Sequence, residues 1–247
     1  MYDLGIIGGM GPLATVEFFK RIVNYTEAGS DQEHLNICIL NKTCIPDRVD
    51  YILNPTRISP LPFLNKSFHE LSELGARVVA IPCNTSHFFV DSFFIPENLR
   101  FINMVSEAIN VMRDYFPYNS ICVVGTTGTK LCGVYDTYAN QIPEIKRLIY
   151  PQQQMQKEIM EIIYKIKAGV DFEKNKINLS CIFDKIMKEN SKIVFLIACT
   201  ELSLYSEELS KLFTVIDSLD ILAIKCVEAC GFKVKEELIP IVIRDAD

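Results

Sequence analysis

The sequence predicts an α/β fold made of two similar halves, each with its own parallel sheet. Short apolar runs that are typical of buried strands alternate along the chain with longer segments whose apolar residues recur at helical spacing. A glycine-rich turn follows the first strand of each half, and the same order of motifs then recurs. Alternating strands and helices favour crossover connections, so the strands of each half are expected to run parallel.

Composition limits the classes of partner. The chain has 247 residues, 49% of them apolar and 23% charged, with a net charge of −6. Nucleic acids and anionic membranes normally bind a basic face, so neither is expected as a partner. The N-terminal residues lack a basic segment followed by an apolar stretch, and the apolar runs are too short to cross a bilayer. We therefore expect a soluble, cytoplasmic protein.

In the first half, the apolar run 2–8 predicts a strand that ends in the turn Gly8–Pro12. Val16, Phe19 and Val23 then mark one face of a helix. A long connection over 42–59 is typical of a lid or binding loop. The other expected elements are strands over 36–41, 77–82 and 101–104, an amphipathic helix over 61–74, a short helix before Pro96 and a helix to about Tyr115.

The second half repeats this plan. Its expected strands cover 120–125, 146–150, 193–198 and 215–217, and its expected helices cover 152–167, 177–189 and 221–230. The last helix comes when the chain is nearly complete, so we expect it to pack back on the first half. The predicted domains are therefore 1–116 together with 218–247, and 117–217.

The two halves match at three pairs of positions. Gly125 follows Gly8 by 117 residues, and Gly128 follows Gly11 by the same interval (125 − 8 and 128 − 11). Cys199 follows Cys83 by 116 residues (199 − 83). Each of these positions lies at the carboxyl end of a predicted strand, where parallel sheets bind ligands. Two copies related by a pseudo-twofold axis would place the two cysteines on opposite walls of one cleft.

Of the nine cysteines, these two stand apart. The number is odd, no Cys-x-x-Cys occurs, and only three histidines are present, so we expect neither a disulfide framework nor a metal site. Seven cysteines are interpreted as small buried apolar residues. Cys83 and Cys199 each follow a buried strand and precede polar residues that could start a helix, which favours a thiolate.

Facing thiols suit racemisation, in which a base removes the Cα proton and an acid on the opposite face returns one. A thiol has a pKa near about 8.5, so both of its forms are accessible near neutral pH. No lysine stands out as a pyridoxal site, so we expect no cofactor, and fixed donors and cations must stabilise the carbanion.

Five segments together resemble the cofactor-independent aspartate/glutamate racemase family, and within it the aspartate racemases most. The segments are Gly8–Pro12, Ile45–Arg48, Ile81–His87, Gly125–Thr129 and Ala198–Glu201. The resemblance covers nearly the whole chain. It implies two flavodoxin-like domains with the active site between them, a homodimer, and a small acidic amino acid as substrate. Ala198 departs from the glycine that is common there, which leaves the pocket size open.

The resemblance also implies roles for individual residues. Cys83 and Cys199 would be the acid/base pair, with Cys199 acting on the L-enantiomer and Cys83 on the D-enantiomer. The substrate-binding residues would be Met10, Arg48, Asn84, Thr85, Thr127, Lys167, Thr200 and Glu201. Lys167 is preferred over Lys165 as the second cation beside Arg48.

Several alternatives remain at this point. A loop arginine such as Arg48 is as often a solvated charge as a carboxylate ligand. His87 could pack or cap a helix, or tune Cys83, and Glu201 could orient Cys199 or occupy a helix start. The rival functions are a glutamate, broad-specificity or hydantoin racemase, an arylmalonate decarboxylase, a non-catalytic amino-acid binding protein, and a redox protein with a Cys83–Cys199 disulfide.

Overall fold

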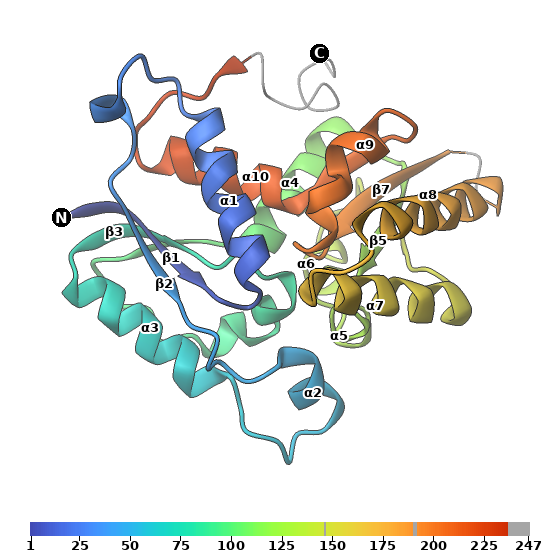
Figure 1. The fold of residues 1–247 in the computed structure, drawn as a ribbon, viewed down its shortest axis with the longest axis horizontal. Helices are drawn as coiled ribbons and strands as arrows, with labels where there is room; N and C mark the ends of the chain where they lie inside the picture. Colours follow the sequence, from blue (N-terminus) through green and yellow to red (C-terminus); the bar gives the residue numbers. More distant parts are fainter. Residues whose placement is uncertain (146, 190–191, 237–247) are drawn as a thin grey trace.

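The structure, a computed structural model that describes residues 1–145, 147–189 and 192–236, contains two four-stranded parallel sheets (Figure 1). The first has the order β2-β1-β3-β4, with β1 (Tyr2–Gly8), β2 (Ile37–Asn41), β3 (Ala76–Ala80) and β4 (Arg100–Ile102). The second has the order β6-β5-β7-β8, with β5 (Ser120–Gly125), β6 (Arg147–Ile149), β7 (Ile193–Ala198) and β8 (Val215–Asp217). The second order repeats the first, which confirms the predicted fold of two flavodoxin-like halves.

Helices cover both faces of each sheet. The first half contains α1 (Pro12–Tyr25), η1 (Asp31–Glu33), α2 (Arg48–Leu53), α3 (Leu61–Glu73), η2 (Asn84–Ser92) and α4 (Met104–Tyr115). The second contains α5 (Thr127–Leu131), α6 (Asp136–Ala139), α7 (Gln153–Lys167), α8 (Phe172–Glu189), η3 (Leu202–Tyr205), α9 (Ser206–Ser210) and α10 (Ser218–Ala229). Among the described residues, no helix combines the length and apolar character that a bilayer crossing requires.

The two halves exchange one helix each. α10 packs with α1 on the first sheet, where Leu222 and Val227 share a core with Leu4 of β1. α4 packs on the second sheet, where Ala108 and Met112 share a core with strands β5 and β7. The two helices also contact each other between the sheets (Figure 1). We propose a division in which α10 joins the first sheet and α4 the second; part of the predicted segment 218–247, residues 237–247, lies outside the described residues.

The apolar face that the sequence suggested for α1 is not the buried one. Val16 is 63% exposed and Phe19 40% exposed, whereas Phe18 and Ile22 are fully buried in the first core. Both faces of this helix carry apolar residues at helical spacing, so periodicity could not choose between them.

The predicted loop over 42–59 contains the short helix α2, which projects from the first half (Figure 1). Asp47 caps it by accepting hydrogen bonds from the backbone N–H groups of Val49 (2.7 Å) and Asp50 (3.1 Å). This cap fixes Arg48 as the first residue of the helix. The loop is therefore an ordered support for that arginine.

A buried ionic cluster ties α1 to the second half. The Arg21 guanidinium donates to Asp217 Oδ2 (2.7 Å) and to the Ser203 carbonyl oxygen (2.6 Å). Asp217 in turn accepts from the Ser203 hydroxyl (2.8 Å) and caps α10 at Leu219. The segment that follows Cys199 is thus held from two directions.

Candidate active site

The first glycine turn places Met10 at the end of β1. Gly9 has φ +89°, and a side chain there would collide with the Lys42 backbone, so only glycine fits easily. Thr15 Oγ1 accepts from the Gly9 N–H (2.9 Å) and donates to the Gly11 carbonyl (3.0 Å). The turn is therefore closed by the first helical residues of α1.

Cys83 lies just beyond the carboxyl end of β3, and its segment is held by His87. The imidazole Nε2 accepts from the Met104 N–H (3.2 Å), so Nδ1 carries the proton and donates it to the Cys83 carbonyl oxygen (3.0 Å). Complete burial lowers the pKa of His87 to about 4, against weaker opposing hydrogen bonds from the backbone. His87 is thus a neutral residue that supports the Cys83 backbone, and both of these hydrogen bonds join its ring to backbone groups rather than to a thiol.

Cys199 lies at the equivalent end of β7 and is nearly inaccessible. Its Sγ donates to Glu201 Oε2 (3.1 Å). Burial and the neighbouring Glu201 carboxylate raise the pKa of the Cys199 thiol well above its ordinary value, and Lys167 only partly opposes them. Cys199 is therefore a thiol at neutral pH.

Arg48, the first residue of α2, lines the inner part of the site together with both cysteines. It is 6% exposed and donates to the carbonyl oxygens of Met10 (2.7 Å) and Pro46 (3.1 Å). Burial lowers the pKa of the guanidinium. The neighbouring Cys83, Asp47 and Glu201 raise it by more, so the pKa lies above its ordinary value. Its buried Nε has no hydrogen-bond partner among the described residues, so the site holds an unused donor.

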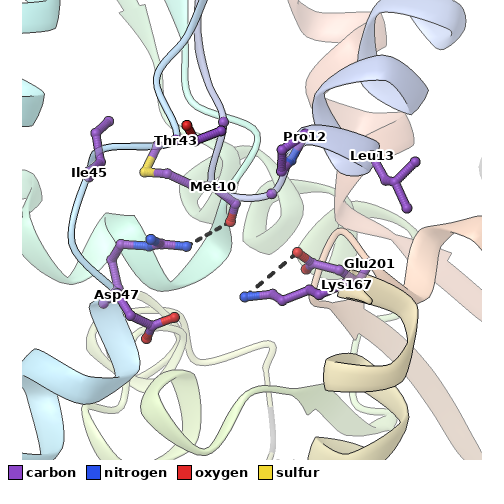
Figure 2. A pocket seen from close by; sticks show the side chains of 11 residues that line it. Met10, Pro12, Leu13, Thr43, Ile45, Asp47, Lys167 and Glu201 are labelled. Carbon is purple, nitrogen blue, oxygen red and sulfur yellow. Dashed lines mark hydrogen bonds and ion pairs between the residues drawn. The ribbon is translucent and has the colours of Figure 1, made fainter. Parts of the chain in front are cut away.

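Lys167, the last residue of α7, faces Arg48's side of the cleft. Its Nζ lies 3.9 Å from Glu201 Oε1, and Figure 2 shows the two side chains reaching toward each other. Burial lowers its pKa, but Glu201 and Cys199 reverse that effect, so the ammonium is retained. Lys165 instead lies 4.0 Å from Asp171, away from the cavity.

Two cavities meet at this place. The outer one, drawn in Figure 2, has a volume of about 430 Å³. The inner one has about 20 Å³, which is room for about one water molecule, and both cysteines line it. The residues shared by the two cavities are Met10, Asp47, Arg48, Lys167 and Glu201. These side chains separate the thiols from the open space.

Hydroxyl and amide groups close the seam between the halves. Thr85 Oγ1 contacts the hydroxyl oxygens of Thr126 (2.9 Å) and Thr129 (3.2 Å), and Thr200 donates to the Pro82 carbonyl (3.2 Å). Asn84 accepts a hydrogen bond from Tyr135 and donates to Ser218 Oγ (3.1 Å). In this structure these polar groups are already paired across the interface.

The family is decided by comparison with known proteins. The family model for Asp/Glu/hydantoin racemases matches residues 7–226. The chain belongs to that family. It is an isomerase of the amino-acid racemase type.

Individual racemases differ in how closely they match. Picrophilus torridus aspartate racemase is 26% identical, with a TM-score of 0.85 and 98% of each chain covered. The broad specificity amino-acid racemase RacX of Bacillus subtilis (strain 168) is 20% identical over 224 residues, which are 89% of this chain and 94% of the relative. A Francisella tularensis glutamate racemase in complex with D-glutamate is 14% identical, with a TM-score of 0.63 and 91% and 79% coverage, and shares the fold.

The racemase brings most of the predicted site residues together. The inner cavity is lined by both cysteines and by Met10, Arg48, Asn84, Thr85, Lys167, Thr200 and Glu201. Thr127 differs: its backbone N–H contacts Met160 Sδ (3.2 Å), and its neighbour Thr126 lines the cavity instead. Thr126 is the N-cap of α5, so the glycine turn presents the residue before the one we expected.

Besides Val49 and Thr126, which line the inner cavity, two further residues were missed by sequence reasoning. Asp47 lines both cavities, and its helix-capping position just before Arg48 was the available signal. Tyr135, the N-cap residue of α6, donates a hydrogen bond to Asn84, and no sequence motif marks the segment in which it lies. Among the described residues, no cluster of three His, Cys, Asp or Glu side chains could hold a metal ion.

Proposed function

We propose that this racemase interconverts L- and D-aspartate without a cofactor, by proton transfer between Cys83 and Cys199. The observation that carries the proposal is that both thiols and two cations, Arg48 and Lys167, line one cavity at the junction of the halves. A dicarboxylate with an ammonium group needs two positive partners, and each half supplies one. The pseudo-symmetric origin of the thiols suits a reaction that treats both enantiomers alike.

The reaction begins with a thiolate on one side only. For D-aspartate, the Cys83 thiolate takes the Cα proton, the C–H bond breaks, and its electron pair is delocalised into the α-carboxylate. Cys199 then gives its thiol proton to the opposite face of Cα, so that a new C–H bond forms and L-aspartate results. The L-to-D direction uses the reverse roles. Arg48 lies beside Cys83 and supplies the counter-charge for its thiolate.

Substrate binding requires the inner cavity to widen. About 20 Å³ does not admit an amino acid, whereas the adjoining cavity of about 430 Å³ does. The side chains between them form an ion pair at 3.9 Å, Lys167 with Glu201, and a hydrogen bond from Arg48 to a carbonyl. A substrate carboxylate can replace these partners one for one, which lets it enter without leaving a buried cation unpaired.

The proposed substrate class is tested by a cofactor-free panel. Each enantiomer of aspartate, glutamate and several neutral amino acids is incubated with the purified protein, and the opposite enantiomer is measured by chiral chromatography. We expect aspartate to be converted in both directions and neutral amino acids to be inert. Faster conversion of glutamate would reassign the substrate, and conversion of neutral amino acids alone would remove Arg48 and Lys167 from substrate binding.

The proposal includes a cytoplasmic homodimer, on the strength of the family resemblance. The exposed apolar face of α1, with Val16 and Phe19, is a surface that self-association would cover. Sedimentation equilibrium is expected to give twice the chain mass, and Phe19→Glu is expected to lower it. A monomer at working concentration would contradict this part alone.

A further inference from the structure

The carboxylate of Glu201 lies between one thiol and one cation. Its Oε2 accepts the Cys199 S–H (3.1 Å), while its Oε1 lies 3.9 Å from Lys167 Nζ. The side chain is 5% exposed, and Oε1 is buried with no hydrogen-bond partner among the described residues. Burial of an unsatisfied polar atom costs free energy, which favours a functional role for this carboxylate over simple packing.

The groups that face Glu201 come from four elements. They are Cys199 at the end of β7, Lys167 at the end of α7, Arg48 at the start of α2, and the N-terminus of α1. At that N-terminus, a Cβ on Gly11 would stand 3.1 Å from Glu201 Oε1, so a side chain there would crowd the carboxylate. The two cations and the helix N-terminus all stabilise a negative charge at this place.

Among the described residues, no carboxylate accepts a hydrogen bond from Cys83 as Glu201 does from Cys199, although Asp47 lines the same cavity. Two residues after Cys83 stands Thr85, whose hydroxyl is engaged with Thr126 and Thr129. The charged side chain that faces Cys83 is Arg48. The two thiols therefore differ in their charged neighbours: Cys199 donates to an anion that Lys167 only partly offsets, whereas Cys83 lies beside a cation.

We propose that Glu201 is a positioning residue that keeps Cys199 protonated in the free enzyme, so that Cys199 starts as the acid and Cys83 as the base. The inference rests on the proposed function and deepens it. Loss of the Cys199 proton to solvent would leave a thiolate against a carboxylate, which is unfavourable. When Cys199 gives its proton to Cα, its S–H bond breaks and a thiolate remains beside Glu201. That thiolate then regains a proton from solvent while the Cys83 thiol releases to solvent the proton it took, which restores the starting state. Alternatively, it takes the Cα proton of L-aspartate while Cys83 returns its own proton to the opposite face, which is the reverse reaction.

The first test needs no substrate. The ultraviolet absorbance of thiolate is titrated against pH in the full-length protein, and the same titration of Cys199→Ser is subtracted so that the difference reports Cys199. In Glu201→Gln, which keeps an oxygen acceptor and loses the charge, we expect the Cys199 midpoint to fall by about one to two pH units. Lys167→Met removes the opposing cation and is expected to raise the midpoint. Glu207→Gln, whose side chain is 90% exposed, is the matched control and should change nothing.

The second test is the pH profile of kcat/KM, which needs one thiolate and one thiol. Its alkaline limb reports the loss of the second thiol proton and should move to lower pH in Glu201→Gln, while the acid limb stays. Because the enantiomers have equal free energies, both directions must show the same limb. The inference would be overturned if neither the alkaline limb nor the Cys199 titration midpoint moved in Glu201→Gln. If Glu201→Gln fails to fold, a Cys199 midpoint that falls in Lys167→Met would overturn it instead. A shifted midpoint in a protein that racemises nothing would instead reject the proposed function alone.

Discussion

The two cysteine segments share a backbone plan and differ in their partners. Each begins one or more residues beyond a buried strand and leads into a 3-10 helix, η2 or η3. At Cys83 the nearby charge is the Arg48 guanidinium, and at Cys199 it is the Glu201 carboxylate. In the proposed mechanism, the duplicated geometry supplies two-sided proton transfer and the unlike neighbours set which thiol starts as the acid. The backbone repeat and the charge asymmetry are separate features, and substitutions can separate them.

The largest expected effect comes from removing either thiol. Cys83→Ser and Cys199→Ser should each lower the racemisation rate by about 10²–10⁴-fold, because a hydroxyl is too weak an acid to serve as the base at neutral pH. The rate is measured by chiral chromatography on L- and D-aspartate. The control is Cys122→Ser, which replaces a cysteine buried in the core of the second half. Activity retained in one of the two site variants would show that only one cysteine transfers the proton.

The next largest effect is expected at Arg48. Arg48→Met should reduce kcat/KM by about 10²-fold or more, since the site loses a fixed cation beside Cys83. Arg48→Lys should recover little, because an ammonium cannot reach both the Met10 and Pro46 carbonyl oxygens in the way a guanidinium does. Steady-state kinetics of both variants distinguish a charge effect from a geometric one. Full rescue by lysine would contradict the geometric part.

A smaller effect separates two neighbouring lysines. Lys167→Ala should raise KM for aspartate about tenfold, the loss of one partly exposed ion pair, which corresponds to about 1.4 kcal/mol. Lys165→Ala removes a side chain that faces Asp171 and should leave KM unchanged. Equal effects of the two substitutions would place the substrate carboxylate elsewhere.

The last expected effect is on stability rather than on rate, and it concerns the support of the Cys83 segment. Burial holds the pKa of His87 at about 4, below the value of 6.5 for a free histidine. Between pH 4 and 6.5 this histidine is protonated in the unfolded chain and neutral in the folded protein. The free energy of unfolding is therefore at its full value above pH 6.5 and falls as the pH drops toward 4. The loss is on the order of 3 kcal/mol.

His87→Gln should flatten this part of the stability curve, because glutamine does not titrate. Urea unfolding at several pH values measures the slope, and His69→Gln, at an exposed histidine, is the control. An unchanged slope in His87→Gln would mean that another group controls stability in this range.

The repeat was visible in the sequence because both halves need the same glycine turns and strand ends. A Cβ at Gly8 would collide with the Thr15 side chain. One at Gly125 would stand 2.6 Å from the Ala198 carbonyl oxygen. Each cysteine follows a continuous apolar run that is typical of a buried strand. Such local constraints leave a clear pattern. The predicted set of cavity residues came from the family resemblance that these motifs carry, and Thr126 lines the cavity in place of Thr127 because the capping residue lies there.

Contacts between distant segments left no such pattern. The position of α4 on the second sheet depends on which of two apolar surfaces this helix meets, and both are apolar in sequence. The same holds for α1, whose outward face carries Val16 and Phe19. The hydrogen bond between Cys199 and Glu201 joins residues that are close in the chain. Its effect on the pKa of Cys199 depends on burial, which the spacing of residues does not reveal.

The most direct test of two-thiol transfer follows solvent deuterium at early times. L-aspartate is converted in D₂O, and mass spectrometry measures deuterium at Cα in both the D-aspartate formed and the L-aspartate recovered. With one monoprotic thiol on each face, the product takes its hydrogen from the opposite thiol while returned substrate keeps its own. We predict deuterium in the product and almost none in the recovered substrate, in either direction. Equal labelling of substrate and product would mean that a single exchanging base serves both faces, and would contradict the account.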